Sequence, residues 1–238
     1  MGVSAPRHPR SSDEELLEAE TSAILAELTD AQRLLRIQDE LRNGFHALGQ
    51  IGKAVSIFGS ARTPRDDPRY ERARQLARRL GEEGFAIITG GGPGIMEAAN
   101  KGAREAGVPS VGLGIELPHE QGMNEYVDLA LNFHYFFTRK VMFVRYASGF
   151  VVFPGGFGTM DELFEAATLR QTEKIRYFPI VLVESEYWNG LAQWLRDSML
   201  ADRYIGESDL EAIAVCDDLE RVIEIVEDVE HRRPRRAA

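Results

Sequence analysis

From Lys53 onward, short apolar runs alternate with longer amphipathic segments. We expect strands in the apolar runs, at residues 54–59, 85–89, 110–115, 129–133, 149–153, 179–183 and 213–215, and helices at about 68–82, 95–106, 137–147, 159–173, 188–200 and 219–229. Strands that are apolar at nearly every position are typical of a parallel sheet buried on both faces. The alternation therefore predicts an α/β fold, Rossmann-like and doubly wound, with a mainly parallel sheet and helices on both faces.

The segment before this pattern is polar and has no strand-like run. Leucines recur unevenly over residues 12–50 and are interrupted at Thr29-Asp30, which predicts two helices, the second capped by Asp30. Such a segment cannot form a core alone, so we expect it to pack on the main domain or on another subunit. The predicted organisation is a disordered tail (1–11), a helical extension (12–50), the α/β domain (51–230) and a basic tail (231–238).

Composition excludes several classes of protein. The 238 residues carry a formal net charge of −10, which argues against a general nucleic-acid binder. No apolar run approaches the roughly 20 residues that a membrane helix needs, and residues 1–10 lack the apolar core of a signal peptide. A single cysteine, Cys216, leaves no intrachain disulfide and no cysteine-based zinc site. We expect a cytoplasmic protein without a recognisable metal-ligand cluster.

Two glycine-rich segments, residues 90–94 and 154–159, each connect a predicted strand to a helix. Glycine lets the backbone turn sharply and approach a ligand, and the following helix offers unpaired N–H groups to an anion. Either turn alone could need glycine only for its geometry, but two at equivalent places favour phosphate binding. Neither has a Gly-Lys-Ser/Thr or a G-x-G-x-x-G pattern. The predicted phosphate is therefore a monophosphate on a small ligand, bound where loops leave the carboxyl ends of the strands.

Charged residues near these turns are the candidates for chemistry. Glu162 lies about one helical turn beyond Thr159, so both side chains can face the same turn. Arg139 and Lys140 lie within the otherwise apolar stretch 135–144, where a buried charge needs an anionic partner. That partner is either a ligand or an internal salt bridge. The isolated histidines His119 and His134 are interpreted as packing or loop residues.

These motifs together resemble the LOG (lonely guy) family, formerly labelled lysine decarboxylases. Residues 154–162 match its PGGxGTxxE signature, and Arg139-Lys140 resembles the arginine that precedes the signature glutamate. Residues 90–99 are similar to the family's other glycine loop, and residues 58–62 to its first strand and turn. The likeness covers about residues 51–229.

The resemblance implies an enzyme that releases the free base from a nucleoside 5′-monophosphate, without a cofactor. Its substrate would be AMP or an N6-substituted AMP of the cytokinin type, and its partners would include neither nucleic acid nor membrane. Arg139 and Glu162 would be the catalytic pair, and Glu116 a further substrate contact. Assembly as a homodimer, or as a larger homo-oligomer such as a hexamer, is also implied. The substrate- and phosphate-binding residues would be Gly59, Ser60, Gly91, Gly92, Met96, Lys140, Pro154, Gly155, Gly156, Phe157, Gly158, Thr159 and Thr168.

Three alternatives stay open at this point. The chain is a broader nucleotide nucleosidase for salvage, or a non-catalytic protein that binds a nucleotide or a phosphorylated cofactor such as molybdopterin. The old family label would instead require a lysine for a Schiff base with pyridoxal phosphate. Of the four lysines, Lys140 is the only suitable one.

Overall fold

The computed structural model describes residues 7–18, 26–117 and 122–232. In this part of the chain seven strands form one sheet in the order β4-β3-β2-β1-β5-β6-β7, and every neighbouring pair is parallel. The predicted fold class is confirmed. The strands are β1 (Ala54–Phe58), β2 (Ala86–Thr89), β3 (Ser110–Ile115), β4 (Leu129–Phe133), β5 (Phe150–Val152), β6 (Ile180–Leu182) and β7 (Ile213–Val215).

Helices cover both faces of the sheet because successive strand residues point to opposite sides. In β1, Ala54 and Phe58 join the core on one face, whereas Val55 and Ile57 join the core on the other. The first face is covered by α2 (Asp30–Leu48), α5 (Phe136–Tyr146), α6 (Phe157–Gln171) and α7 (Ser185–Trp194). The second is covered by α3 (Pro68–Glu82), α4 (Ile95–Ala106) and α9 (Leu219–Arg232).

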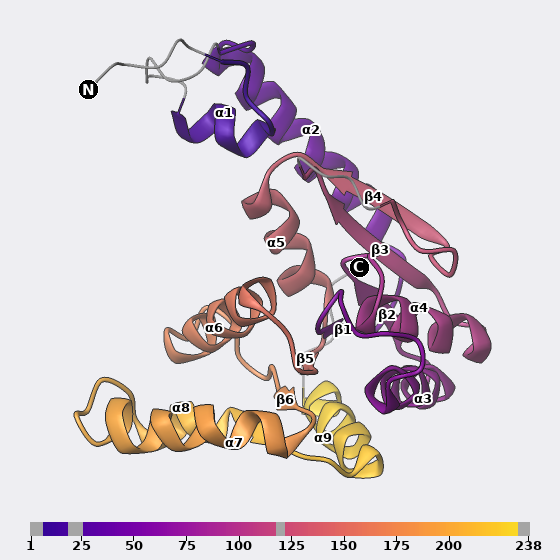
Figure 1. Cartoon of the computed structure of the whole chain (residues 1–238), viewed down its shortest axis with the longest axis vertical. Coiled ribbons are helices and arrows are strands. Elements are labelled where there is room, and N and C mark those ends of the chain that lie inside the picture. The colour runs from indigo at the N-terminus through magenta and orange to yellow at the C-terminus, as the bar shows by residue number, and fades with distance from the viewer. Residues whose placement is uncertain (1–6, 19–25, 118–121, 233–238) are drawn as a thin grey trace.

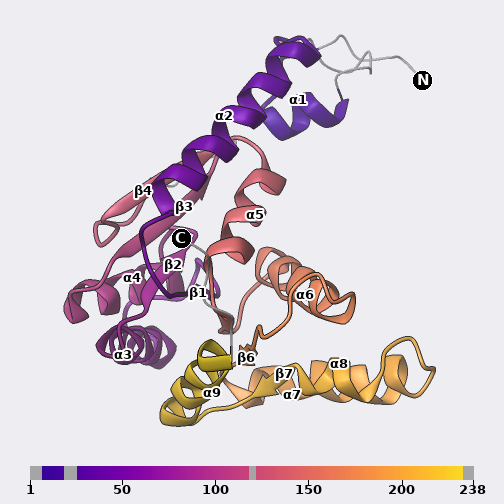
Figure 2. The same ribbon diagram turned by 180° about the vertical axis from the view of Figure 1, so that it is seen from behind.

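The helical extension consists of α1 (Ser12–Glu18) and α2, and it lies at the opposite end of the molecule from α7 and α9 (Figures 1 and 2). The predicted cap was wrong by one residue: Thr29 caps α2, and Asp30 is its first helical residue. A buried ion pair between Arg33 of α2 and Glu15 of α1, 3.0 Å between the charged atoms, joins the two helices.

Element boundaries differ from the prediction mainly at helix ends. Helix α6 begins at Phe157, two residues before its predicted start, and α9 continues to Arg232, into the predicted basic tail. A π-helical turn (Leu195–Leu200) follows α7, and a short α8 (Glu207–Glu211), which was not predicted, precedes β7. Residues 1–6 and 233–238 of the predicted tails lie outside the described residues.

The order of strands reverses beside β1. The chain runs outward from β1 through β2, β3 and β4, and then returns to the other side of β1 as β5, β6 and β7. Loops that leave the carboxyl ends of β1 and β5 therefore diverge, and in open α/β sheets ligands bind in the crevice at such a switch point. Figure 1 shows α5 and α6 on the same side of the sheet, flanking this position.

Candidate functional site

A cavity of about 680 Å³ lies at this switch point. Its volume is within the range of small-molecule sites. The lining comes from the turn after β1, the loop after β2, the start of α4, helix α5 and the first turns of α6. The residues are Phe58, Gly59, Ser60, Ala61, Arg62, Gly90, Met96, Phe136, Arg139, Gly156, Phe157, Gly158, Thr159, Asp161 and Glu162.

The first turn of α6 presents unpaired amides to the cavity. The first helical hydrogen bond of α6 runs from Met160 N to Gly156 O, 3.0 Å. The N–H groups of Phe157, Gly158 and Thr159 therefore have no carbonyl partner in the described chain. A β-carbon placed on Gly158 would meet nothing within 4 Å, so the space in front of this turn is open. Amides and helix dipole together make a cradle for an anion.

Glu162 is a buried carboxyl group at the edge of that cradle. The residue lines the cavity but is only 5% exposed, and its Oε2 has no hydrogen-bond partner within the described residues. Burial raises the pKa of Glu162 to about 7, although the positive charges of Lys140 and Arg139 oppose the rise. A buried carboxyl group with a raised pKa is a common feature of active sites.

Arg139 of α5 brings a positive charge to the same cavity. Its Nε donates to the carbonyl of Leu113 in β3, 2.8 Å, which fixes the guanidinium beside the cavity. A β-carbon at position 90 would lie 2.6 Å from Arg139 Nη2, so glycine at this position leaves room for the arginine. Burial lowers the pKa of Arg139, and the charge of Glu162 opposes that change. The two predicted catalytic residues thus share one cavity and interact electrostatically.

Lys140 does not line the cavity. Its ammonium lies 2.8 Å from Asp161 Oδ1 and 2.9 Å from Glu165 Oε2, both on α6. Burial lowers the pKa of Lys140, but the hydrogen bonds to these two carboxylates outweigh it and leave the pKa raised. The sequence left open whether the partner of Arg139 and Lys140 is a ligand or an internal salt bridge, and for Lys140 it is an internal salt bridge.

Several other predicted residues support the cavity without lining it. Carbonyl groups of Gly91 and Gly92 accept from Asn124 Nδ2, 3.0 Å each, and the carbonyl of Pro154 accepts from Ser60 N, 2.9 Å. Thr168 lies near the other end of α6, in a shallow groove with Phe164, and its hydroxyl donates to the carbonyl of that residue.

Glu116 and His134 each have a hydrogen-bond partner outside the cavity. Glu116 accepts hydrogen bonds from the amide and hydroxyl of Ser12, so it anchors α1 and does not line the cavity. Ring Nδ1 of His134 lies 2.7 Å from Glu40 Oε1, which supports its interpretation as a packing residue. His119 lies outside the described residues.

The cavity is also lined by residues that the sequence did not assign to the site, among them Arg62, Phe136 and Asp161. Arg62 lies in the turn after β1, at the same sheet edge as the glycine loops, and it has no ion-pair partner in the described ranges. Phe136, the first residue of α5, adds an aromatic ring at 41% exposure. The sequence offered one signal for each of these two: Arg62 follows the predicted site residue Ser60 by two positions, and Phe136 lies one helical turn before Arg139.

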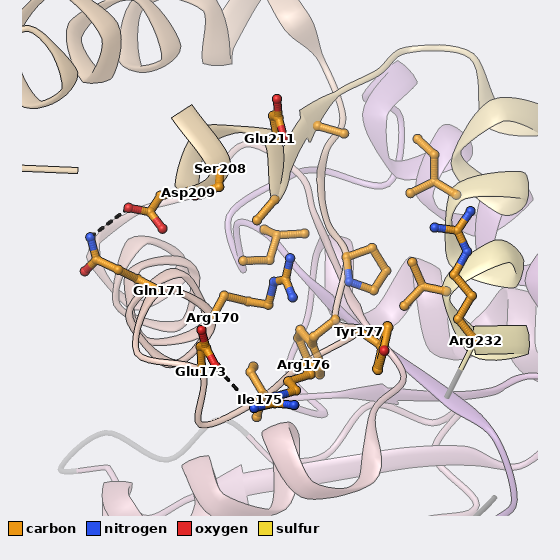
Figure 3. Close-up of a pocket in the computed structure, with 17 residues that line it drawn as sticks. Arg170, Gln171, Glu173, Ile175, Arg176, Tyr177, Ser208, Asp209, Glu211 and Arg232 are labelled. Atoms are coloured by element: carbon orange, nitrogen blue, oxygen red, sulfur yellow. Dashed lines mark hydrogen bonds and ion pairs between the residues drawn. The ribbon is translucent and has the colours of Figure 1, made fainter. Parts of the chain in front are cut away.

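A second cavity, about 570 Å³, lies at the opposite edge of the sheet, near the amino ends of β6 and β7 (Figure 3). Three arginines line it, but three acidic residues line it as well, so it has no excess of positive charge. The charged lining residues are Arg170, Arg176, Arg232, Glu173, Asp209 and Glu211. Its acidic side chains are not buried, in contrast to Glu162. The predicted catalytic pair, Arg139 and Glu162, lies at the first cavity. No group of three or more potential metal ligands occurs within residues 7–18, 26–117 and 122–232.

The fold and the first cavity define a Rossmann-like α/β protein with a site for a small anionic ligand. The chain belongs to the family described as possible lysine decarboxylases, whose model matches residues 96–226. The relationship expected from the PGGxGTxxE signature is thereby confirmed.

Curated relatives carry names of nucleotide-cleaving enzymes. A cytokinin riboside 5′-monophosphate phosphoribohydrolase of Mycobacterium tuberculosis is 28% identical over 171 residues, which is 69% of this chain and 88% of the relative. A pyrimidine/purine nucleotide 5′-monophosphate nucleosidase of Escherichia coli is 31% identical over 130 residues, 48% of this chain but 27% of the relative.

Solved structures share the fold at low identity. The protein TM1055 has a TM-score of 0.56 at 23% identity over 74% of this chain and 98% of its own. A molybdenum cofactor binding protein of Rippkaea orientalis has a TM-score of 0.54 at 20% identity, covering 75% of this chain and 96% of its own. At such identities the likeness concerns the fold alone. Within the described residues no helix is long and apolar enough to cross a membrane.

Proposed function

We propose that this protein hydrolyses the N-glycosidic bond of a purine or cytokinin nucleoside 5′-monophosphate and releases the free base and ribose 5-phosphate. One observation carries the proposal. The buried, unpartnered carboxyl group of Glu162 lies one helical turn from the free amides of α6, in a cavity that also holds Arg139. The names of the curated relatives support the reaction class.

The proposed mechanism follows from the charge that develops on the sugar. When the C1′–N9 bond breaks, its electron pair goes to the base, and the ribose acquires positive, oxocarbenium-like charge. Ionised Glu162 stabilises this charge, and it orients the water or attacks C1′ itself. Water finally supplies the hydroxyl group at C1′, and the base takes up a proton. The 5′-phosphate on the amides of Phe157, Gly158 and Thr159 holds the ribose beside the carboxylate.

Arg139 has two possible tasks in this scheme, to pair with oxygens of the phosphate or ribose, or to polarise the departing base. The aromatic rings of Phe136 and Phe157 offer flat surfaces on which a purine can stack. Phe157 is 95% exposed, so its ring is accessible to a ligand.

The binding-only alternative uses the same cradle but needs no buried carboxylate. An unpaired buried acid costs stability, and a pure phosphate carrier would be better without a negative charge next to its anion. Decarboxylation through a Schiff base is disfavoured by Lys140, whose ammonium is held by two carboxylates and whose pKa is raised. A broader nucleosidase that accepts AMP or other monophosphates remains the alternative within the same chemistry.

The test is incubation of the purified protein with AMP and with isopentenyladenosine monophosphate, followed by detection of free base and ribose 5-phosphate. Glu162→Gln keeps the shape of the side chain and removes its charge, so we expect base release to be abolished while calorimetry still detects AMP binding. Glu186→Gln, at an exposed position on α7, is the matched control and should retain full activity. Full turnover by Glu162→Gln would reject the catalytic role. AMP binding without turnover by the wild type would favour the carrier.

We also propose that the protein acts in the cytoplasm as a homodimer or a larger homo-oligomer. Besides Phe136 and Phe157 of the cavity, three apolar side chains of α5 and α6 are more than a third exposed and form candidate contacts: Phe137, Val141 and Phe164. Light scattering over a range of concentrations tests the assembly, and a monomer at every concentration would contradict it.

A further inference from the structure

One hydroxyl group of helix α7 forms a hydrogen bond with the glycine loop that precedes α6. The hydroxyl of Tyr187 donates to the carbonyl of Gly155, 2.7 Å. Tyr187 does not line the 680 Å³ cavity, whereas Gly156, the next residue after Gly155, does. The carbonyl of Gly155 is therefore held on the side of the loop that faces α7.

The direction of that carbonyl determines the direction of the next amide. Carbonyl and N–H groups of a planar trans peptide point in roughly opposite directions, and no peptide bond in the described residues is cis. When Tyr187 holds the carbonyl of Gly155 toward α7, the N–H of Gly156 points the other way. That amide has no hydrogen-bond partner in the described part of the chain, and a β-carbon on Gly156 would meet nothing within 4 Å.

The backbone that carries Tyr187 is anchored on both sides of this residue, although the residue itself is 46% exposed. The carboxylate of Asp217 accepts from the amides of Glu184 and Ser185, 2.8 Å each, and from the Ser185 hydroxyl, which fixes the start of α7. Trp188 is fully buried, donates to the carbonyl of Val183 and packs edge-on against the Tyr187 ring, with centroids 4.8 Å apart. These contacts hold the start of α7 and one edge of the ring in the orientation that brings the hydroxyl to the carbonyl of Gly155.

We propose that Tyr187 is a positioning residue for anion binding: by fixing the Gly155–Gly156 peptide, it turns the Gly156 N–H into a fourth donor beside the three amides of α6. The inference rests on the proposed phosphate site but not on the hydrolytic step. Without the hydroxyl, the peptide can rotate, and the cradle loses a preorganised donor. A single neutral hydrogen bond contributes modestly, so we expect affinity for the phosphate to fall about three- to tenfold.

The experiment compares wild type with Tyr187→Phe, which keeps the ring and removes only the hydroxyl. We expect KM for AMP to rise about three- to tenfold with kcat nearly unchanged. Adenosine lacks the 5′-phosphate, so its kcat/KM should be the same for both proteins. Tyr204→Phe is the matched control, since Tyr204 is exposed and far along the chain from the glycine loop.

Calorimetry with ribose 5-phosphate separates this inference from the proposed function. If the wild type does not hydrolyse AMP but Tyr187→Phe binds ribose 5-phosphate more weakly, the hydrolase proposal fails and the positioning role stands. If Tyr187→Phe lowers only the melting temperature and leaves both KM for AMP and the affinity for ribose 5-phosphate unchanged, Tyr187 is structural and the inference is overturned.

Discussion

Burial of Glu162 should make the protein more stable at low pH than at high pH, through this one group. Its pKa rises from 4.5 to about 7 on folding, because the folded environment disfavours the charged form. Each tenfold change in proton affinity corresponds to about 1.4 kcal/mol, so the ionised side chain costs about 3 kcal/mol of folding free energy above pH 7. The replacement Glu162→Gln cannot ionise and should not incur this cost.

The pH window follows from the direction of the shift. Below pH 4.5 the carboxyl group is protonated in both states, so its ionisation has no effect on stability. Between pH 4.5 and about 7 only the folded state holds the proton, and the stability of the wild type falls as pH rises. Above about pH 7 the full cost is present. The gain in stability from Glu162→Gln should therefore increase by about 2 kcal/mol between pH 5.5 and pH 8.

Urea unfolding of both proteins at pH 5.5, 6.5, 7.5 and 8 measures this difference directly. Glu186→Gln removes one charge from an exposed position and provides the baseline for the change in net charge. A difference between wild type and Glu162→Gln that is the same at every pH would refute the reasoning. It would mean that water or a neighbouring group solvates the carboxylate in the folded protein.

Two further predictions concern activity. If ionised Glu162 is required, kcat/KM for AMP should rise with pH and level off above about 7, and a kcat/KM that falls over pH 6–8 would instead indicate a protonated acid. Arg62→Gln should raise KM for AMP more than Lys140→Gln does, because Arg62 lines the cavity and Lys140 is paired with Asp161 and Glu165. Steady-state kinetics of both variants checks the order, and the reverse order would restore the phosphate-binding role that the sequence resemblance implied for Lys140.

The sequence predicted the sheet well because each strand is apolar along nearly its whole length, a pattern that helices do not share. It also predicted that Arg139 and Glu162 would meet, although only through the family resemblance. The start of α6 was missed by two residues because Gly156 and Phe157 offer no side-chain cap. At α2 the signal was present: Thr29 and Gln32 form a capping box, and its Thr-x-x-Gln spacing indicates Thr29 rather than Asp30 as the cap.

Contacts between elements distant in the chain were beyond sequence reasoning. Lys140 precedes its partners Asp161 and Glu165 by more than twenty residues, and only the packing of α5 against α6 brings them together. The same holds for Tyr187 of α7 and Gly155 of the loop after β5, whose hydrogen bond depends on how α7 packs. A pattern along one chain gives the type of each element, but the pairing of side chains across elements depends on the angles at which helices pack.

Glu40 of α2 connects the helical extension to the helix that carries Arg139. Its buried carboxylate accepts from the amide of His134 and, at 2.6 Å, from the hydroxyl of Thr138, so α2 holds the beginning of the helix that carries Arg139. A shortened protein that begins at β1 would retain every residue of the cavity and still lose this support. If the proposed function holds, we expect an active fragment to need residues 30–48 in addition to the sheet.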